Sequence, residues 1–206
     1  MSSPGQIVIL NGAPRCGKSS IAAEIQTRFD GVWLNLGVDA WAVVTPPQYR
    51  PGIGLRPGGE RPDLEPQVQR LYAALYEAVA AASRQGLNVV VDVGHHDRYS
   101  RPLGILPECA RRLTGLPVLF VGVRCPIEEI MRRRNTDTSG HYVGGVADNP
   151  PAPVLLWQSE VHQPGVYDLE LDTGALSPAE CAVVIHERLS AGLPSPTAFE
   201  QLAASL

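Results

Sequence analysis

The sequence predicts an α/β fold in which a mostly parallel, five-stranded sheet lies between two layers of helices. Three observations support this prediction. Short apolar runs rich in valine and isoleucine alternate with helical patterns along the 206 residues. A glycine-rich stretch stands between the first apolar run and the first helical pattern. The chain is 44% hydrophobic, which at this length is enough to bury one sizeable core, so we expect a single domain over residues 1–206.

Five apolar runs have the length and composition of strands that are buried on both faces of a parallel sheet. The first reads Ile-Val-Ile-Leu, and the third reads Val-Val-Val-Asp, so that an acidic residue stands at its carboxyl end. The second run is less regular than the others. In chain order, the expected strands are residues 7–10, 32–38, 89–92, 118–123 and 166–171.

Helical patterns separate these strands. Between the second and third strands, Val68, Leu71 and Leu75 recur at intervals of three and four, which predicts an amphipathic helix. Pro126 stands at the first turn of a later helix, where the missing N–H of proline is no loss. The expected helices are residues 19–29, 66–85, 107–113, 126–134, 154–162 and 178–189, with a last short helix towards the C-terminus.

Two long segments show neither pattern. Residues 45–66 are dense in proline and glycine, and residues 135–153 follow three consecutive arginines. Both segments would leave the carboxyl ends of strands, which is where open parallel sheets bind ligands. Because long irregular loops in compact domains are commonly binding loops or lids, we expect a substrate loop at residues 45–66 and a lid region at residues 132–153.

The composition argues against several classes of protein. The net charge is -4 and no basic tail or patch is visible, which disfavours a nucleic-acid partner. No apolar run approaches the length that spans a membrane, and no signal peptide is recognisable. The four cysteines are widely scattered without the spacing of a zinc site, so we expect free thiols in a cytoplasmic protein. The sequence leaves homo-oligomerisation open.

The glycine-rich stretch matches the phosphate-loop pattern G-x-x-x-x-G-K-[S/T] in full. It stands between a predicted strand and a predicted helix, which is the context that this motif requires. Backbone N–H groups of such a loop converge on phosphate oxygens, and the start of the helix adds the positive end of its dipole. We therefore expect a three-layer P-loop NTPase fold that binds a nucleoside triphosphate through Gly12, Ala13, Pro14, Arg15, Cys16, Gly17, Lys18, Ser19 and Ser20.

Lys18 is the only lysine among 17 basic residues, and the other 16 are arginine. Lysine carries a compact ammonium on a flexible stem, whereas arginine carries a wide planar fork. A lysine retained at this one position favours a role that arginine cannot fill. We expect Lys18 to bridge the β- and γ-phosphates as a catalytic residue and Ser19 to ligate Mg²⁺.

Asp92 closes the third predicted strand, which is the usual place for a second metal ligand, although a helix cap or a turn is an alternative role. The next residue is Val93, where motor ATPases have a glutamate that activates water. The N-K-x-D motif of guanine recognition is also absent, since it would need a second lysine. These features favour a kinase, in which the hydroxyl of a small molecule takes the place of water.

Transfer to an alcohol needs a group that removes or orients the hydroxyl proton. Asp39 follows the second predicted strand, on the same rim as the phosphate loop, and is the best candidate for this catalytic base. Aspartate is also a common cap at the start of a helix, and a helix beginning at Ala40 would give Asp39 that role. The sequence pattern alone favours neither the catalytic role nor the capping role of Asp39.

Arginines after the fourth predicted strand are candidates to neutralise the transferring phosphoryl group. Three consecutive residues of a helix cannot all face one ligand. We expect Arg132 or Arg133 to face the phosphates as a catalytic residue, with Arg124 nearby. A solvated helix end, where cations complement the dipole, has comparable weight. The sequence does not decide which of Arg124, Arg132, Arg133 and Arg134 contacts phosphate.

His95 and His96 follow the third predicted strand, but no third ligand has a suitable spacing for a metal site. We therefore favour the interpretation that the two histidines belong to a substrate loop. Trp41, Tyr49 and Trp157 could line an aromatic acceptor pocket, although core packing is the more common role for each of them.

Several pieces of the sequence, in one order over residues 5–190, carry a further signal. They are Ile7-Val8-Ile9-Leu10-Asn11-Gly12 with Gly17-Lys18-Ser19, Trp33-Leu34 with Gly37-Val38-Asp39, Val89-Val90-Val91-Asp92, Phe120-Val121-Gly122-Val123-Arg124-Cys125, and His162 with Tyr167-Asp168 and Leu171-Asp172-Thr173. In these pieces the chain resembles the chloramphenicol phosphotransferase family of P-loop kinases. The phosphate loop alone is shared with many kinases, whereas residues 37–39 and 120–125 are fairly specific.

The resemblance implies a kinase that uses ATP and Mg²⁺, with Asp39 as the base that faces a primary hydroxyl. Residues 45–66 and 135–153 depart from the family's pattern, and acceptor specificity is expected there. The predicted function is an ATP-dependent phosphotransferase acting on a hydroxyl of a small molecule, with an antibiotic such as chloramphenicol as one candidate acceptor. The alternatives are a metabolic kinase resembling the adenylylsulfate or shikimate type and a nucleotide-dependent binding module without catalysis.

Overall fold

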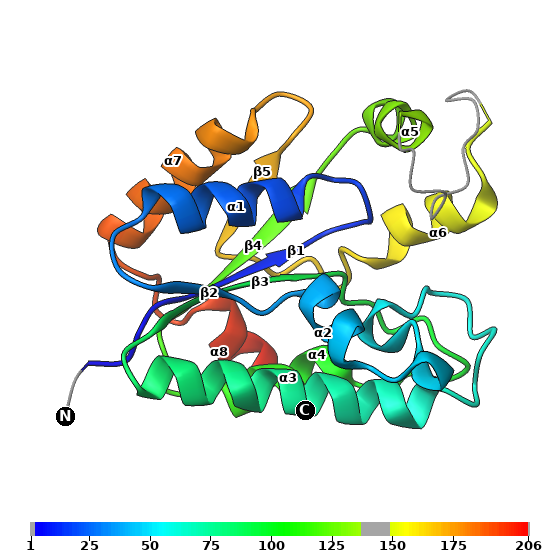
Figure 1. Ribbon diagram of the computed structural model, residues 1–206, viewed down its shortest axis with the longest axis horizontal. Coiled ribbons are helices and arrows are strands. Elements are labelled where there is room, and N and C mark those ends of the chain that lie inside the picture. The colour runs from blue at the N-terminus through cyan, green and yellow to red at the C-terminus, as the bar shows by residue number, and fades with distance from the viewer. Residues whose placement is uncertain (1–2, 137–148, 206) are drawn as a thin grey trace.

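The computed structural model describes residues 3–136 and 149–205, and one parallel sheet forms its centre (Figure 1). The strands lie in the order β2-β3-β1-β4-β5, and each neighbouring pair is parallel. The predicted five-stranded parallel sheet is therefore confirmed. The strands are β1 (Ile7–Asn11), β2 (Trp33–Asn35), β3 (Asn88–Val93), β4 (Val118–Arg124) and β5 (Leu169–Asp172).

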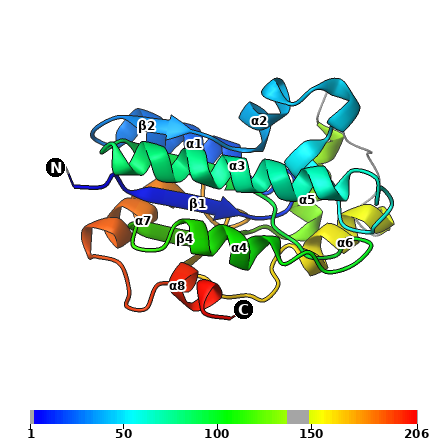
Figure 2. The same cartoon turned by 90° about the horizontal axis from the view of Figure 1, so that it is seen from below.

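Helices cover both faces of the sheet, which gives the three layers that the sequence predicts (Figures 1 and 2). On one face lie α1 and α7, and on the other lie α3, α4 and α8. In Figure 1, α5 and α6 lie beyond the carboxyl ends of the strands. The helices are α1 (Lys18–Arg28), α2 (Val38–Val44), α3 (Glu65–Arg84), α4 (Ile105–Arg112), α5 (Ile127–Asn135), α6 (Ala152–Glu160), α7 (Pro178–Ser190) and α8 (Ala198–Ala203).

The central strand β1 has apolar side chains on both faces of the sheet, so helices must pack against both faces. Ile7 and Ile9 point into the core beneath α3, whereas Val8 and Leu10 point into the core beneath α1, because successive side chains of a strand alternate. All four side chains are completely buried. Burial of each contributes roughly 2 kcal/mol to folding. The phosphate loop thus begins at the carboxyl end of a strand that is completely buried and paired on both sides.

The second predicted strand was too long at its carboxyl end. It ends at Asn35, whose side-chain Oδ1 accepts a hydrogen bond from Gly37 N at 3.2 Å. A side-chain acceptor of this kind offers the backbone an alternative to the ladder of a sheet. The chain turns there and α2 begins at Val38, so Asp39 lies in the first turn of a helix and not beyond the end of a strand.

Residues 45–66 were predicted to form a long irregular substrate loop, and part of this segment packs into the core. It contains two short 3-10 turns, η1 (Pro47–Tyr49) and η2 (Gly52–Gly54). Ile53 and Leu55 are buried, and Ile53 O accepts a hydrogen bond from the buried hydroxyl of Tyr72 on α3 at 3.0 Å. The apolar residues between the prolines and glycines therefore anchor the loop against α3.

The predicted lid at residues 132–153 is described only at its ends. Its first residues form the last turn of α5, and its final residues lead into α6. Residues 137–148 of this prediction lie outside the described residues.

Two expectations from composition can also be compared with the structure. All four cysteines are free, as their spacing predicted, and all four are buried. Within residues 3–136 and 149–205, no helix is long and apolar enough to cross a membrane.

Candidate active site

The phosphate loop connects β1 to α1, and its glycines stand where other residues do not fit. A Cβ on Gly12 would overlap the carbonyl oxygen of Val123. Gly17 caps α1 with a φ of 99°, in the left-handed region that favours glycine. The first N–H groups of α1 have no partner within the helix, and this arrangement binds phosphate at the N-termini of helices.

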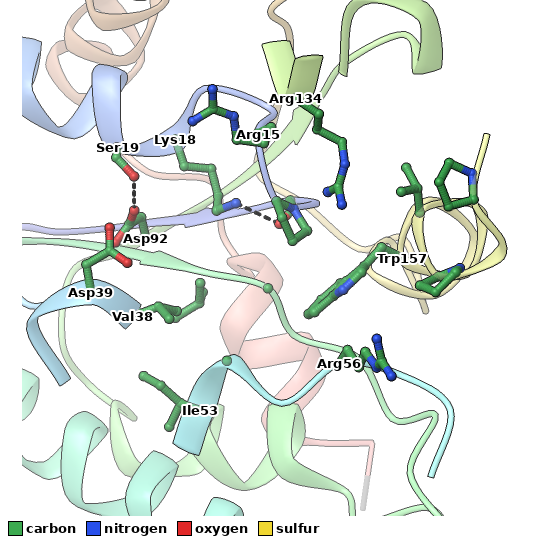
Figure 3. A pocket seen from close by; sticks show the side chains of 18 residues that line it. Arg15, Lys18, Ser19, Val38, Asp39, Ile53, Arg56, Asp92, Arg134 and Trp157 are labelled. Atoms are coloured by element: carbon green, nitrogen blue, oxygen red, sulfur yellow. Dashed lines mark hydrogen bonds between the residues drawn. The ribbon is translucent and has the colours of Figure 1, made fainter. Parts of the chain in front are cut away.

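Lys18 is the first residue of α1, and its side chain folds back over the loop (Figure 3). Its Nζ donates hydrogen bonds to Gly12 O at 2.8 Å and to Ala13 O at 2.9 Å. The two carbonyls hold the ammonium at the edge of the loop. A triphosphate would offer charged acceptors, which form stronger hydrogen bonds than neutral carbonyls do.

Ser19 and Asp92 meet beside this loop. The Ser19 hydroxyl donates a hydrogen bond to Asp92 Oδ2 across 2.6 Å (Figure 3). Asp92 is 6% exposed, and its carboxylate contacts Gly37, where a Cβ would overlap Oδ1. Serine and aspartate thus place two oxygen donors side by side on a rigid support.

These donors fit Mg²⁺, which takes oxygen ligands and is usually held by one or two carboxylates together with phosphates and water. Among the described residues, no cluster of three or more His, Cys, Asp or Glu side chains could hold a metal ion. A magnesium ion at Ser19 and Asp92 would therefore depend on the phosphates of a nucleotide and on water for its other ligands.

Asp39 lies on the opposite wall from the phosphate loop. The N-cap of α2 is Gly37 and no side chain caps this helix, so Asp39 does not have the capping role that the sequence left open. Its exposed carboxylate faces the space that Asp92 and Lys18 also border (Figure 3).

Two cavities adjoin at these residues. Arg15, Lys18, Ser19 and Asp39 line both of them. The first has a volume of ≈ 470 Å³ and the second a volume of ≈ 530 Å³. The first continues over apolar side chains, namely Val38, Ile53, Val154 and Trp157. The second continues along the start of α1 towards Glu129, Arg132, Arg133, Thr173 and Leu176.

The predicted arginines have different surroundings. Arg133 is 25% exposed in its side chain and donates to Thr173 O at 2.7 Å and to Arg15 O at 3.3 Å. Arg132 is 67% exposed and pairs with Glu129. The pKa of Glu129 is lowered to about 2, first by the hydrogen bond from Arg132 and then by that from Arg133. Both arginines line the second cavity, but only Arg133 holds the loop backbone.

The phosphate loop and α5 hold one another by reciprocal contacts. The Arg15 guanidinium donates to Arg133 O at 2.6 Å, while Arg133 donates to Arg15 O. Arg15 has a φ of 70°, the only positive φ of a non-glycine residue among those described. Arg124, the fourth candidate, pairs with Glu170 and lines neither cavity.

His95 and His96 are buried, which differs from the predicted substrate-loop role. The His95 ring shares a hydrogen bond of 2.7 Å with the Tyr76 hydroxyl, and burial lowers its pKa to about 3, with repulsion from His96 adding to the effect. His96 Nε2 lies 2.9 Å from Leu55 O. The His95 ring therefore connects the end of β3 to α3, and the His96 ring connects it to the segment between α2 and α3.

Two further arginines line the first cavity: Arg134, which the sequence left open as a phosphate contact, and Arg56, which the sequence did not single out. Arg134 comes from the end of α5 and Arg56 from the segment between α2 and α3 (Figure 3). Trp157 of α6 lies between them in this view, so one of the three aromatic candidates does line the cavity. Trp41 packs against the core, and Tyr49 is 42% exposed. The only sequence signal for Arg56 was that a cationic side chain stands within the predicted substrate loop at residues 45–66.

Solved structures share this fold. A sugar kinase from Janibacter sp. HTCC2649 superimposes with a TM-score of 0.62 at 18% identity, over 92% of this chain and 96% of that chain. The APS kinase CysC of Mycobacterium tuberculosis superimposes with a TM-score of 0.55 at 18% identity, over 92% of this chain and 99% of that chain. These likenesses establish the fold of P-loop kinases.

Sequence comparison gives the family. A protein of Mycobacterium tuberculosis (strain H37Rv) assigned as an O-phosphotransferase is 28% identical, over 96% of this chain and 88% of its own length. The model of the chloramphenicol phosphotransferase-like proteins matches residues 5–190. The chain belongs to the chloramphenicol phosphotransferase-like family and is an enzyme of the kinase type.

Proposed function

We propose that this chain transfers the γ-phosphoryl group of ATP to a hydroxyl of a small molecule, with Mg²⁺ as the metal. The observation that carries the proposal is the junction of two cavities at Lys18, Ser19 and Asp39. A phosphoryl transfer needs a donor and an acceptor on either side of one point, and catalysis then depends on position and charge.

The second cavity suits the nucleotide. It runs along the first turn of α1, where unpaired N–H groups and the helix dipole favour phosphate. Lys18 would contact the β- and γ-phosphates there, and Arg133 adds a guanidinium beside the loop. Ser19 and Asp92 would hold Mg²⁺, which neutralises developing charge on the phosphates when it is bound.

The first cavity suits the acceptor, and Asp39 would act as the base. The reaction forms a bond between the acceptor oxygen and the γ-phosphorus and breaks the bond from that phosphorus to the bridging oxygen, so that ADP leaves. The proton of the acceptor hydroxyl passes to the Asp39 carboxylate. Asp39 lines both cavities, and this position supports the role.

Apolar and aromatic walls favour an acceptor with substantial apolar surface. Chloramphenicol is one candidate, and phosphorylation would then confer resistance by inactivating the drug. A cytoplasmic reaction follows from the use of ATP. A metabolic alcohol is the other class of acceptor to include in a test.

The test is ADP release by the purified protein in the presence of ATP and Mg²⁺, with a panel of hydroxylated antibiotics and metabolites. We expect at least one compound to stimulate ADP release and to gain one phosphate by mass. Lys18→Arg should abolish that activity without lowering the thermal stability appreciably. ATP binding without stimulation by any compound would favour a binding module instead, and near-normal turnover by Lys18→Arg would contradict the proposal.

A further inference from the structure

The acceptor cavity is chemically polarised along its length. Asp39, Asp92 and Lys18 border one end, next to the phosphate loop (Figure 3). Trp157 and Arg56 border the other end. Val38 and Ile53, which are apolar, line the wall between the two ends (Figure 3). A molecule that spans this cavity would meet Asp39, Asp92 and Lys18 at the reacting end and Arg56 with the Trp157 ring at the other end.

The Trp157 ring is held in a fixed position. It meets the buried His96 ring edge to face, with centroids 5.1 Å apart and an interplanar angle of 87°. A Cβ on Gly94 would lie 2.9 Å from Trp157 Cζ3, so the absence of a side chain at this position lets the indole approach the backbone. An aromatic side chain fixed in this way is a platform for a flat group, because offset stacking depends on a defined ring plane.

Arg56 is held by its backbone but can exchange its ionic partner. The preceding residue, Leu55, is buried, and its carbonyl oxygen lies 2.9 Å from His96 Nε2. The guanidinium pairs with Glu60, and the two side chains are 53% and 55% exposed. An exposed pair of this kind contributes about 0–1 kcal/mol. A substrate anion could therefore replace Glu60 at little cost.

We infer that the acceptor is a hydroxylated compound with a flat ring and an anionic group, such as a carboxylate, remote from the reacting hydroxyl. The ring stacks on Trp157 and the anion pairs with Arg56, while the hydroxyl reaches Asp39. Arg134, whose guanidinium points towards the same cavity in Figure 3, adds positive charge on the facing wall. In the reverse orientation the anion would lie beside Asp39 and the phosphates of the nucleotide, which would repel it. This inference rests on the proposed function, since it assigns the acceptor of the same site.

The test compares acceptors that differ by one charge. Suitable probes are para-(hydroxymethyl)benzoate, its longer propanoate homologue, and the neutral methyl ester of each acid. Each pair shares the ring and the primary hydroxyl. We expect ADP release with kcat/KM about tenfold higher for an acid than for its ester, which corresponds to about 1.4 kcal/mol. Added salt should weaken the preference, because exposed ion pairs are screened.

Three variants test whether Arg56 is the cation that pairs with the anionic group of the acceptor. Arg56→Gln should raise KM for the acids about tenfold, with little change in kcat and no change for the esters. Arg61→Gln is the matched control, because Arg61 lies in the same segment, pairs with Asp63 and does not line the cavity. Glu60→Gln removes the competing carboxylate and should lower KM for the acids severalfold.

The outcomes separate this inference from the proposed function. Turnover of the esters equal to that of the acids, or equal losses in Arg56→Gln and Arg61→Gln, would overturn the inference and leave the kinase intact. If no probe is turned over, binding is measured by quenching of tryptophan fluorescence, with Trp157→Phe as the reference. Binding of the acids alone would uphold the inference while the proposed transfer fails. Absence of binding by both acids would overturn it.

Discussion

Gly37 and Asp92 come from neighbouring segments of the sheet rim and meet without space between them. A Cβ on residue 37 would overlap Asp92 Oδ1, while the other carboxylate oxygen accepts the hydroxyl of Ser19 at 2.6 Å. The contact fixes the carboxylate from behind and aims it at the phosphate loop. It also sets the start of α2, and thus the position of Asp39.

Gly37→Ala should therefore weaken the binding of Mg²⁺ at Asp92 more than it lowers the stability of the fold. The φ of Gly37 is -82°, which alanine adopts freely, so the substitution acts through the overlap with Asp92. We expect kcat to fall on the order of tenfold or more and the Mg²⁺ concentration for half-maximal rate to rise. Gly54→Ala is the control, because its methyl would make an ordinary contact 3.4 Å from Val38 Cγ1. Equal Mg²⁺ dependence in the two variants would contradict this account.

Asp39→Asn tests the proposed base. Loss of the carboxylate should leave ATP binding intact and lower kcat on the order of a hundredfold or more. The stability cost should be small, because a charge near the start of a helix contributes about 0.3–1 kcal/mol. Asp30→Asn, at an exposed position just after α1, supplies the comparison. A lowered melting temperature with unchanged kcat would give Asp39 a structural role only.

Arg133→Gln and Arg132→Gln form a matched pair on one helix. Both arginines pair with Glu129, but Arg133 is partly buried and also bonds the backbone of Arg15 and Thr173, whereas Arg132 is exposed. Hydrogen bonds from a charged group contribute about 2 kcal/mol, so Arg133→Gln should lower Tm by roughly 4–8 °C. Arg132→Gln should lower it by much less. Thermal unfolding of both variants measures the two shifts in Tm. Equal shifts would contradict the different contacts that the structure gives the two arginines.

The free energy of unfolding should decrease as the pH is lowered below the ordinary pKa of histidine. Burial lowers the pKa of His95 to about 3, so the folded protein keeps this ring neutral while the unfolded chain binds a proton below about 6.5. Its contribution is fully present above pH 6.5 and is lost progressively as pH falls towards 3. His162, with a pKa lowered to about 4 chiefly by burial, acts in the same direction.

His95→Gln should make this pH dependence shallower. Removal of one such group reduces the slope of the unfolding free energy by roughly 1 kcal/mol per pH unit. Urea unfolding between pH 4 and 8 measures the slope, with the wild type as the reference. Parallel curves for the two proteins would show that His95 is not the group responsible.

The parallel sheet, the phosphate loop and the order of the elements could be predicted from the amino-acid sequence alone. Each of these depends on information within a few residues, such as the apolar run of β1 or the glycines that flank Lys18. The position of Asp92 at the end of β3 follows from the same local pattern.

The contacts of the polar side chains could not be predicted from the sequence, because they join residues that are far apart along the chain. Arg133 finds its acceptor in Thr173, 40 residues away, and His96 finds Leu55 at a separation of 41. Consecutive arginines look alike in the sequence, but the helix turns each by about 100°, so Arg133 holds the loop and Arg132 faces solvent. The polarity of the acceptor cavity likewise arises from α2, α5, α6 and the segment after α2, which come together only when the sheet is formed.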